Sequence, residues 1–150
     1  MRVPASVPKK GDYYPTVRAW MARLGATELD IKANEIFLDE RGCRAYVAAI
    51  LGPKFNLRFR RLNSSEGRGW HKGITLDRDL VEAKRMSLGT VLHECAHAIQ
   101  WRKYAERAKL RRERMAETRT YRAKVARRDH CGHGEPFCRT YARLLREAMQ

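Results

Sequence analysis

The 150-residue sequence predicts one α+β domain, because two kinds of hydrophobic periodicity occupy separate parts of the chain. Apolar residues recur at helical spacing near both ends, whereas a central segment alternates between apolar and polar side chains. Hydrophobic residues make up 43% of the chain, which suffices for a genuine core, and no Pro- or Gly-rich linker divides the interior. We therefore expect a flexible tail over residues 1–11 and a single domain over residues 12–150.

Two helices are expected at the start of this domain. Residues 12–24 have apolar side chains at helical spacing and end before Gly25. Residues 39–51 repeat the pattern and end at Gly52-Pro53, a pair that stops a helix.

The central segment predicts two strands. Residues 55–60 alternate strictly, with Phe55, Leu57 and Phe59 on one side, as in a half-buried strand. Residues 64–69 are rich in turn-forming Ser and Gly, so we expect them to connect this strand to a second one over Trp70–Leu76.

Two more helices are expected in the second half. One begins near Ser87, and no Gly or Pro interrupts the chain from Thr90 to Cys131, so helical structure is expected to continue far beyond His97. The last helix begins near Pro136, a residue suited to a first helical turn. Its apolar stripe, which is expected to pack against the helix that starts near Ser87, consists of Phe137, Tyr141, Leu144, Leu145 and Ala148.

The segment from His93 to His97 has the pattern H-E-x-x-H. Positions i and i+4 share one face of a helix, so both imidazoles can reach a single metal ion. Zinc accepts neutral imidazole and keeps an open position for water where the protein supplies only three ligands. Glu94 would stand beside that water and act as its general base. The pattern therefore predicts a catalytic zinc ion with His93 and His97 as ligands.

The flanking residues support a buried helix with a functional face. At 100° per residue the histidines and Glu94 lie opposite an apolar stripe. The alternative is a solvated helix on which the two histidines are incidental. The stripe consists of Leu88, Val91, Leu92, Cys95, Ala96 and Ile99.

A catalytic zinc ion needs a third protein ligand, and the residues leave several candidates. His130 and His133 stand just before the last helix, and Glu117 would serve if a following helix supplied a carboxylate. Cys131 is a softer donor, although a small structural cysteine is the simpler interpretation. His71 belongs to the expected second strand and would face either solvent or the cleft.

Here the chain resembles the SprT-like/Spartan family of zinc metalloproteases. That family combines a helical H-E-x-x-H with a downstream H-G-x-x-[FW], which this chain matches at His133-Gly134-Glu135-Pro136-Phe137. The upstream segment Gly73–Asp77 is similar to the family's G-x-I-x-L strand. The resemblance covers residues 54–149, the protease domain without the family's C-terminal cysteine zinc ribbon. The interval between His97 and His133 is longer than in the family.

The resemblance implies a fold, an activity and a set of site residues. The fold would be a zincin-like α+β domain, with a small sheet packed on the H-E-x-x-H helix and further helices. His93, His97 and His133 would bind Zn²⁺, and Glu94 would be the catalytic acid/base of peptide-bond hydrolysis. The implied substrates are proteins bound or crosslinked to DNA.

The charge of the chain points independently to a polyanionic partner. The formal net charge is +15 and the pI is about 10.3, values that favour nucleic acid or an acidic membrane surface. Twelve Lys and Arg residues against three Glu lie between residues 102 and 128, in a basic helical insertion expected at about 101–128. Within it, Arg111, Arg112 and Arg114 are the candidate DNA contacts. The alternative is a solvated helix exterior.

Other features constrain the setting of the protein. No run of 18 apolar residues exists, so we expect no membrane span. The N-terminus lacks the apolar region of a signal peptide, so we expect an intracellular, nucleoid-associated protein with reduced cysteines. Two further functions stay open: a regulatory zinc peptidase that cleaves a specific protein, and a non-enzymatic DNA-binding module with structural zinc.

Overall fold

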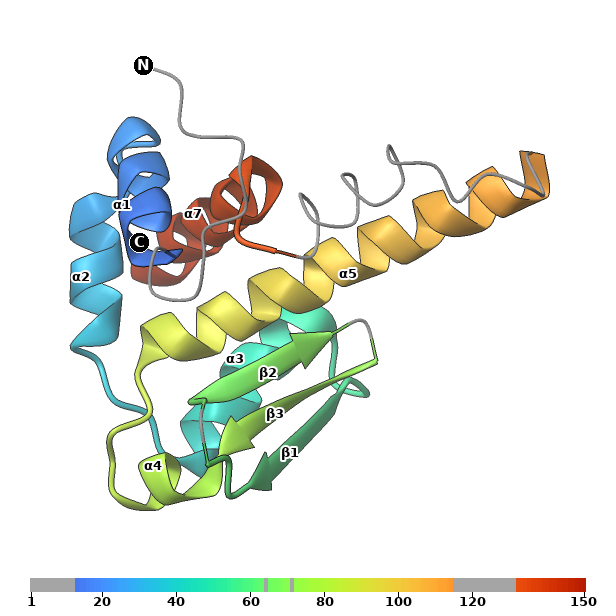
Figure 1. The fold of residues 1–150 in the computed structure, drawn as a ribbon. Coiled ribbons are helices and arrows are strands. Elements are labelled where there is room, and N and C mark those ends of the chain that lie inside the picture. Colours follow the sequence, from blue (N-terminus) through green and yellow to red (C-terminus); the bar gives the residue numbers. More distant parts are fainter. Residues whose placement is uncertain (1–12, 64, 71, 115–131) are drawn as a thin grey trace.

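In the computed structural model, residues 13–63, 65–70, 72–114 and 132–150 are described. They form an α+β fold of six helices and one three-stranded mixed sheet (Figure 1). In chain order the elements are α1 (Tyr13–Arg23), α2 (Thr27–Asn34), α3 (Glu40–Leu51), β1 (Asn56–Arg60), β2 (Gly67–Trp70), β3 (Gly73–Asp77), α4 (Arg78–Glu82), α5 (Leu88–Arg114) and α7 (Glu135–Met149). The predicted tail, residues 1–11, lies outside the described residues.

The helices predicted at 12–24 and 39–51 are confirmed as α1 and α3. The Asp39 carboxylate caps α3 by accepting a hydrogen bond of 2.7 Å from the Gly42 N–H, which satisfies one donor at the start of the helix. The helix expected near Ser87 is α5, which continues to Arg114 within the described part of the chain. The last helix is α7, with Pro136 in its first turn.

The strand prediction was right for β1 and wrong for the segment after it. The single strand expected over Trp70–Leu76 is two antiparallel strands, β2 and β3, with Trp70 paired to Gly73 across the reversal. The first of these strands includes Gly67 and Gly69, which the sequence had suggested as part of a turn. These glycines belong to a strand because β2 packs directly on α5, where side chains would not fit.

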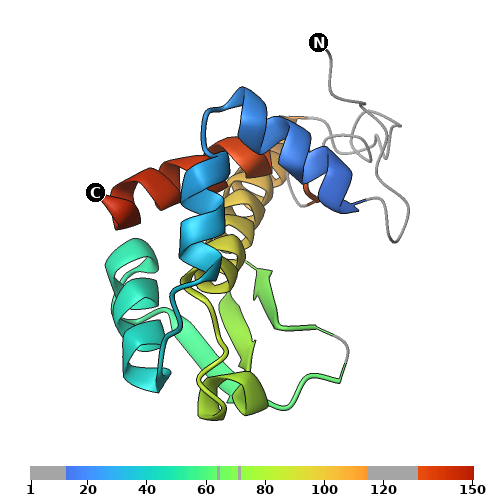
Figure 2. The ribbon, with the colours of Figure 1, turned by 90° about the vertical axis from the view of Figure 1, so that its left-hand side faces the viewer.

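The order of strands is β1-β3-β2, so β2 is an edge strand. β1 is parallel to β3, and β2 is antiparallel to β3. The apolar residues of the sheet, including Phe59, Ile74 and Leu76, are buried on the side of α3 and α5. Figure 2 shows α3 on one side of the sheet, in agreement with Figure 1.

Two helices were not expected. Among the eight residues of α2 only Ala33 is buried, so its hydrophobic periodicity is too weak to be seen in the sequence. The five-residue α4 starts where the Asp77 carboxylate accepts a hydrogen bond from the Leu80 N–H. Such a short helix has too few turns to establish a pattern.

The predicted packing of the last helix against the H-E-x-x-H helix is confirmed. α7 lies along α5, and buried Gln100 of α5 donates a hydrogen bond to the Thr140 hydroxyl of α7. Cys43, Cys95 and Cys138 are buried free thiols. Among the described helices, none combines the length and apolar character that a membrane crossing requires.

Candidate metal centre

The helix α5 turns one face to the core and another to a cleft. The apolar stripe predicted for this helix is buried from Leu88 to Ala96, and Ile99 is partly buried. His93 and His97 lie one turn apart, with their ring centroids 4.8 Å from each other. Burial of the apolar stripe fixes the rotation of the helix and therefore the direction in which the two imidazoles point.

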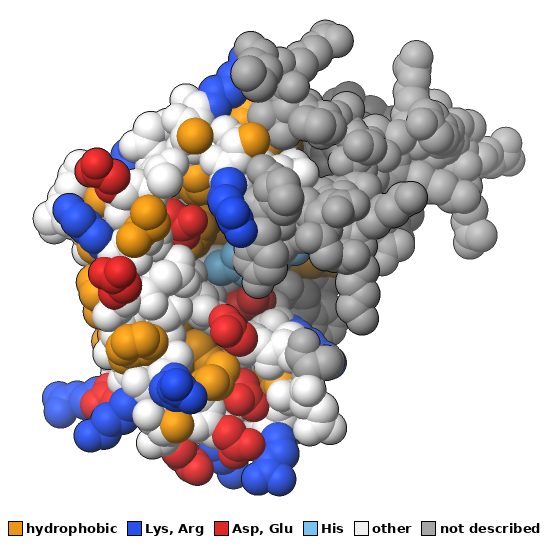
Figure 3. All heavy atoms as spheres, turned by 60° about the vertical axis from the view of Figure 1, so that its left-hand side comes forward, with side chains coloured by type: hydrophobic (Ala, Val, Ile, Leu, Met, Phe, Trp, Pro, Cys, Tyr) orange, Lys and Arg blue, Asp and Glu red, His pale blue; other side chains and the backbone are white. Residues whose placement is uncertain are grey.

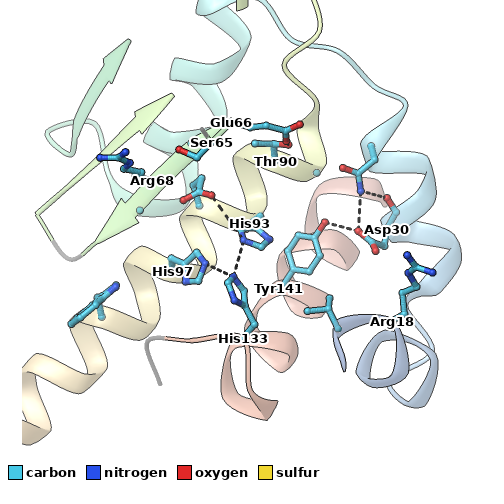
Figure 4. A pocket seen from close by; sticks show the side chains of 17 residues that line it. Arg18, Asp30, Ser65, Glu66, Arg68, Thr90, His93, His97, His133 and Tyr141 are labelled. Atoms are coloured by element: carbon cyan, nitrogen blue, oxygen red, sulfur yellow. Dashed lines mark hydrogen bonds and ion pairs between the residues drawn. The ribbon is translucent and has the colours of Figure 1, made fainter. Parts of the chain in front are cut away.

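The third imidazole comes from the turn that precedes α7. His133 Nε2 lies 2.8 Å from His97 Nε2 and 3.2 Å from His93 Nε2 (Figure 4). The three rings thus point their nitrogens toward one place, and each offers a ligand atom within 4.8 Å of the others. His93, His97 and His133 are close enough together to bind a metal ion.

The Phe137 side chain packs against all three histidines of the cluster. It is fully buried, and its ring centroid lies 4.8 Å from that of His93, 4.5 Å from His97 and 4.9 Å from His133. The Cys138 thiol also lies 3.6 Å from the His133 carbonyl oxygen, in position to donate to it. These contacts attach the turn before α7 to the core and hold His133 over α5.

The cluster is electrically neutral at ordinary pH. Burial lowers the pKa of His97 to about 3 and that of His133 to about 4, and the neighbouring His133 imidazole adds to the effect at His97. The pKa of His93 is well below its usual value for the same reasons, burial first. Neutral imidazole is the form that coordinates a metal.

Glu94 is buried beside the cluster, with its Oε1 4.0 Å from His93 Nε2. Burial, and to a lesser extent the Glu66 carboxylate, raises its pKa to about 8. A side chain at Gly69 would place its Cβ 2.2 Å from the Glu94 carbonyl oxygen, and one at Gly67 would place it 2.9 Å from Glu94 Cγ. Strand β2 therefore confines both the backbone and the side chain of Glu94.

The three histidines and Glu94 line a cleft of about 760 Å³, which lies between α5, β2, α7 and the first two helices. Figure 3 shows the histidines in a hollow with acidic side chains near them. On one wall, the Tyr141 hydroxyl donates to Asp30 Oδ1 at 2.6 Å. On another, the Thr90 hydroxyl donates to Glu66 Oε2 at 2.8 Å.

Sequence reasoning missed these wall residues. Tyr141 was assigned only to the apolar stripe of the last helix, although its ring lies 5.8 Å from that of His93. Asp30 belongs to a helix that was not expected, and Glu66 to a segment expected as a turn. The pattern of the sequence contained no signal that would have joined these three residues.

Several predicted site residues cannot be placed. His130, Glu117, Cys131 and His71 lie outside the described residues. Arg111, Arg112 and Arg114 fall on the described backbone of α5, but their side chains lie outside the described part.

The histidine cluster is thus assembled from two segments that are far apart in the sequence. No protein-family model, curated protein or solved structure matches the chain. The motifs and the geometry of the cleft are therefore the indications of what the protein does.

Proposed function

We propose that this protein is a zinc-dependent endopeptidase of zincin-like fold, in which His93, His97 and His133 hold the metal and Glu94 is the catalytic acid/base. The observation that supports this most strongly is the convergence of the three imidazole nitrogens next to a buried carboxylate in an open cleft. A structural role would not need Glu94 beside the metal or a cleft of that size.

The donor set suits zinc. Nitrogen ligands at about 2.0–2.1 Å around tetrahedral zinc are about 3.3 Å apart. The Nε2 atoms of His93 and His133 are 3.2 Å apart, and those of His97 and His133 are 2.8 Å apart. The remaining ring nitrogen of His97, Nδ1, is buried and lacks a hydrogen-bond partner within the described part of the chain.

Three neutral nitrogen ligands leave a coordination position for a water molecule or for substrate. Among the described residues the potential ligand group has three members, the number of protein ligands that a catalytic zinc site uses. Bound zinc supplies a Lewis acid that polarises a carbonyl group and acidifies a water molecule.

Glu94 then has two tasks at its carboxylate. It accepts the proton of the attacking water, and it delivers that proton to the nitrogen of the departing amine. Its pKa of about 8 in the metal-free protein lies near neutral pH, where one group can both accept and release a proton. A neighbouring cation favours the ionised form, which is the form that acts as a base.

The substrate assignment depends on charge and on the motif resemblance. A net charge of +15 attracts DNA, and the two histidine motifs resemble those of proteases that act on DNA-bound proteins. We infer that proteins bound or crosslinked to DNA are the substrates.

The experiment is zinc analysis and a peptidase assay, with and without DNA, on the wild type, Glu94→Gln and Glu106→Gln. Glu106 is exposed on the same helix and provides the matched control. We expect zinc in all three proteins and a loss of hydrolysis by orders of magnitude in Glu94→Gln alone. Equal activity in Glu94→Gln and the wild type would exclude the mechanism, and zinc without any hydrolysis would favour a structural metal site.

A further inference from the structure

The sheet has an open face opposite its buried one. α3 and α5 lie on the buried side, where Arg44 of α3 covers the Phe59 ring and Glu94 of α5 contacts the β2 glycines. Figures 1 and 2 show no described helix over the opposite side. Side chains alternate along a strand, so residues 58 and 60 of β1 and residue 68 of β2 belong to the open face.

Arginines occupy all three of these positions. Arg58 and Arg68 are each paired with Thr75 of the central strand, so they lie in one row across the sheet. Arg60 follows two residues after Arg58, about 6.8 Å along the strand, and Arg68 lies about 9.6 Å across the sheet from Arg58. All three side chains are exposed. We name Arg58, Arg60 and Arg68 the basic sheet face.

The charge of the basic sheet face is not neutralised by the described residues. Within the described part of the chain, no carboxylate lies within 4.0 Å of these three guanidinium groups, although nearby Arg61 is paired with Asp79 at 2.9 Å. Asp77 is opposite Arg60 in register. Its carboxylate is buried and accepts hydrogen bonds from the Leu62 and Leu80 N–H groups.

We propose that the basic sheet face binds the phosphate backbone of nucleic acid and so brings the substrate to the cleft. Guanidinium groups match phosphate oxygens in geometry as well as charge, and three on one face of the sheet can contact successive phosphates of an extended polyanion. Arg68 also contributes to the rim of the cleft that contains the histidines and Glu94, and its side chain extends away from the histidines (Figure 4). A protein attached to the bound strand would therefore lie beside Glu94. The choice of nucleic acid as partner rests on the proposed function, whereas the position of the surface rests on the sheet alone.

The test compares DNA binding by the full chain with all three arginines changed to Gln, and by a control in which Lys32, Arg41 and Arg85 are changed to Gln. The control cations are exposed and lie outside the sheet, and their substitution removes the same charge. Binding to labelled single- and double-stranded DNA is measured between 50 and 200 mM salt. The triple variant should lose about 2–3 units of slope in log K against log salt, at about 0.7–0.9 per phosphate contact, whereas the control slope stays within about 0.5 of wild type.

Thermal melting establishes whether each variant is folded. If the triple variant is unfolded, the single variants Arg58→Gln and Arg68→Gln replace it, and each should lose about 0.7–0.9 of slope. A slope equal to that of wild type, or an equal loss in the control, would overturn the proposal. So would binding of wild type to phosphatidylserine vesicles but not to DNA. All binding is also measured in Glu94→Gln, which changes the proposed catalytic carboxylate and none of the three arginines. If the wild type shows no peptidase activity but the triple variant still loses DNA binding, the proposal for the basic sheet face stands and only the proposed function fails.

Discussion

Gly69→Ala is the substitution that tests most directly how strand β2 confines Glu94. The added Cβ would lie 2.2 Å from the Glu94 carbonyl oxygen, 3.0 Å from its carbonyl carbon and 3.2 Å from its Cα. All three atoms belong to the backbone of α5, so no side-chain rotation can relieve the contact. Non-bonded carbon and oxygen atoms approach to about 3.3 Å, so the strand and the helix must separate by about 1 Å.

The expected cost follows from that displacement. Overpacking a buried contact costs about 1–3 kcal/mol, and a contact made only by backbone belongs at the upper end of this range. For a chain of this size, about 3 kcal/mol corresponds to a Tm lower by roughly 6–12 °C. A displacement of about 1 Å at a reacting group can reduce the rate about 100-fold. We therefore expect the folded Gly69→Ala protein, assayed below its Tm, to have peptidase activity about 100-fold below that of wild type.

Two other glycines provide controls for this measurement. Gly67→Ala would meet the Glu94 side chain at 2.9 Å and Leu76 at 3.1 Å, atoms that can rotate away, so we expect a loss of about 1 kcal/mol. Gly25→Ala meets nothing within 4 Å, but its φ of 68° strains any side chain, at about 1–2 kcal/mol. Thermal melts of the zinc-loaded variants give the comparison. A Gly69→Ala protein that melts within about 2 °C of wild type would refute the close approach of β2 to α5.

Three further predictions concern the candidate metal centre. In a metal titration, His133→Ala should lose zinc as severely as His97→Ala, because the Nε2 atoms of His133 and His97 lie 2.8 Å apart. His130→Ala should have a milder effect, and zinc retained only in His133→Ala would contradict this prediction. Zinc at about 1,000 times its Kd should stabilise the wild type by about 4 kcal/mol, seen as a rise in Tm that a chelator reverses and that His97→Ala lacks. Phe137→Ala should cost about 3–5 kcal/mol in chemical denaturation and also weaken zinc binding, because its fully buried ring contacts all three imidazoles. A destabilised Phe137→Ala protein with unchanged zinc affinity would show that the ring supports the core but not the ligands.

The sequence predicted those features that depend on near neighbours in the chain. His93 and His97 share a helix face because four residues make about one turn, and the apolar stripe opposite them determines which face is buried. The strand over 56–60 likewise follows from alternation within six residues. His133 was one of several ligand candidates, and only the motif singled it out, because no local pattern relates it to His97, which lies 36 residues earlier in the chain.

Tertiary packing decided what local patterns could not encode. The same Ser-, Gly-rich segment could be a turn or a strand, and it became β2 because Gly67 and Gly69 allow the backbone to contact α5. Asp30, Glu66 and Tyr141 line one cleft because α2, the β1–β2 connection and α7 pack around α5. The row of Arg58 and Arg68 exists only because both strands pair with β3, which adds two separate segments to one surface. Periodicity reports which side of a segment is buried, but the partner that buries it is chosen by shape and by the hydrogen bonds of segments distant in the chain.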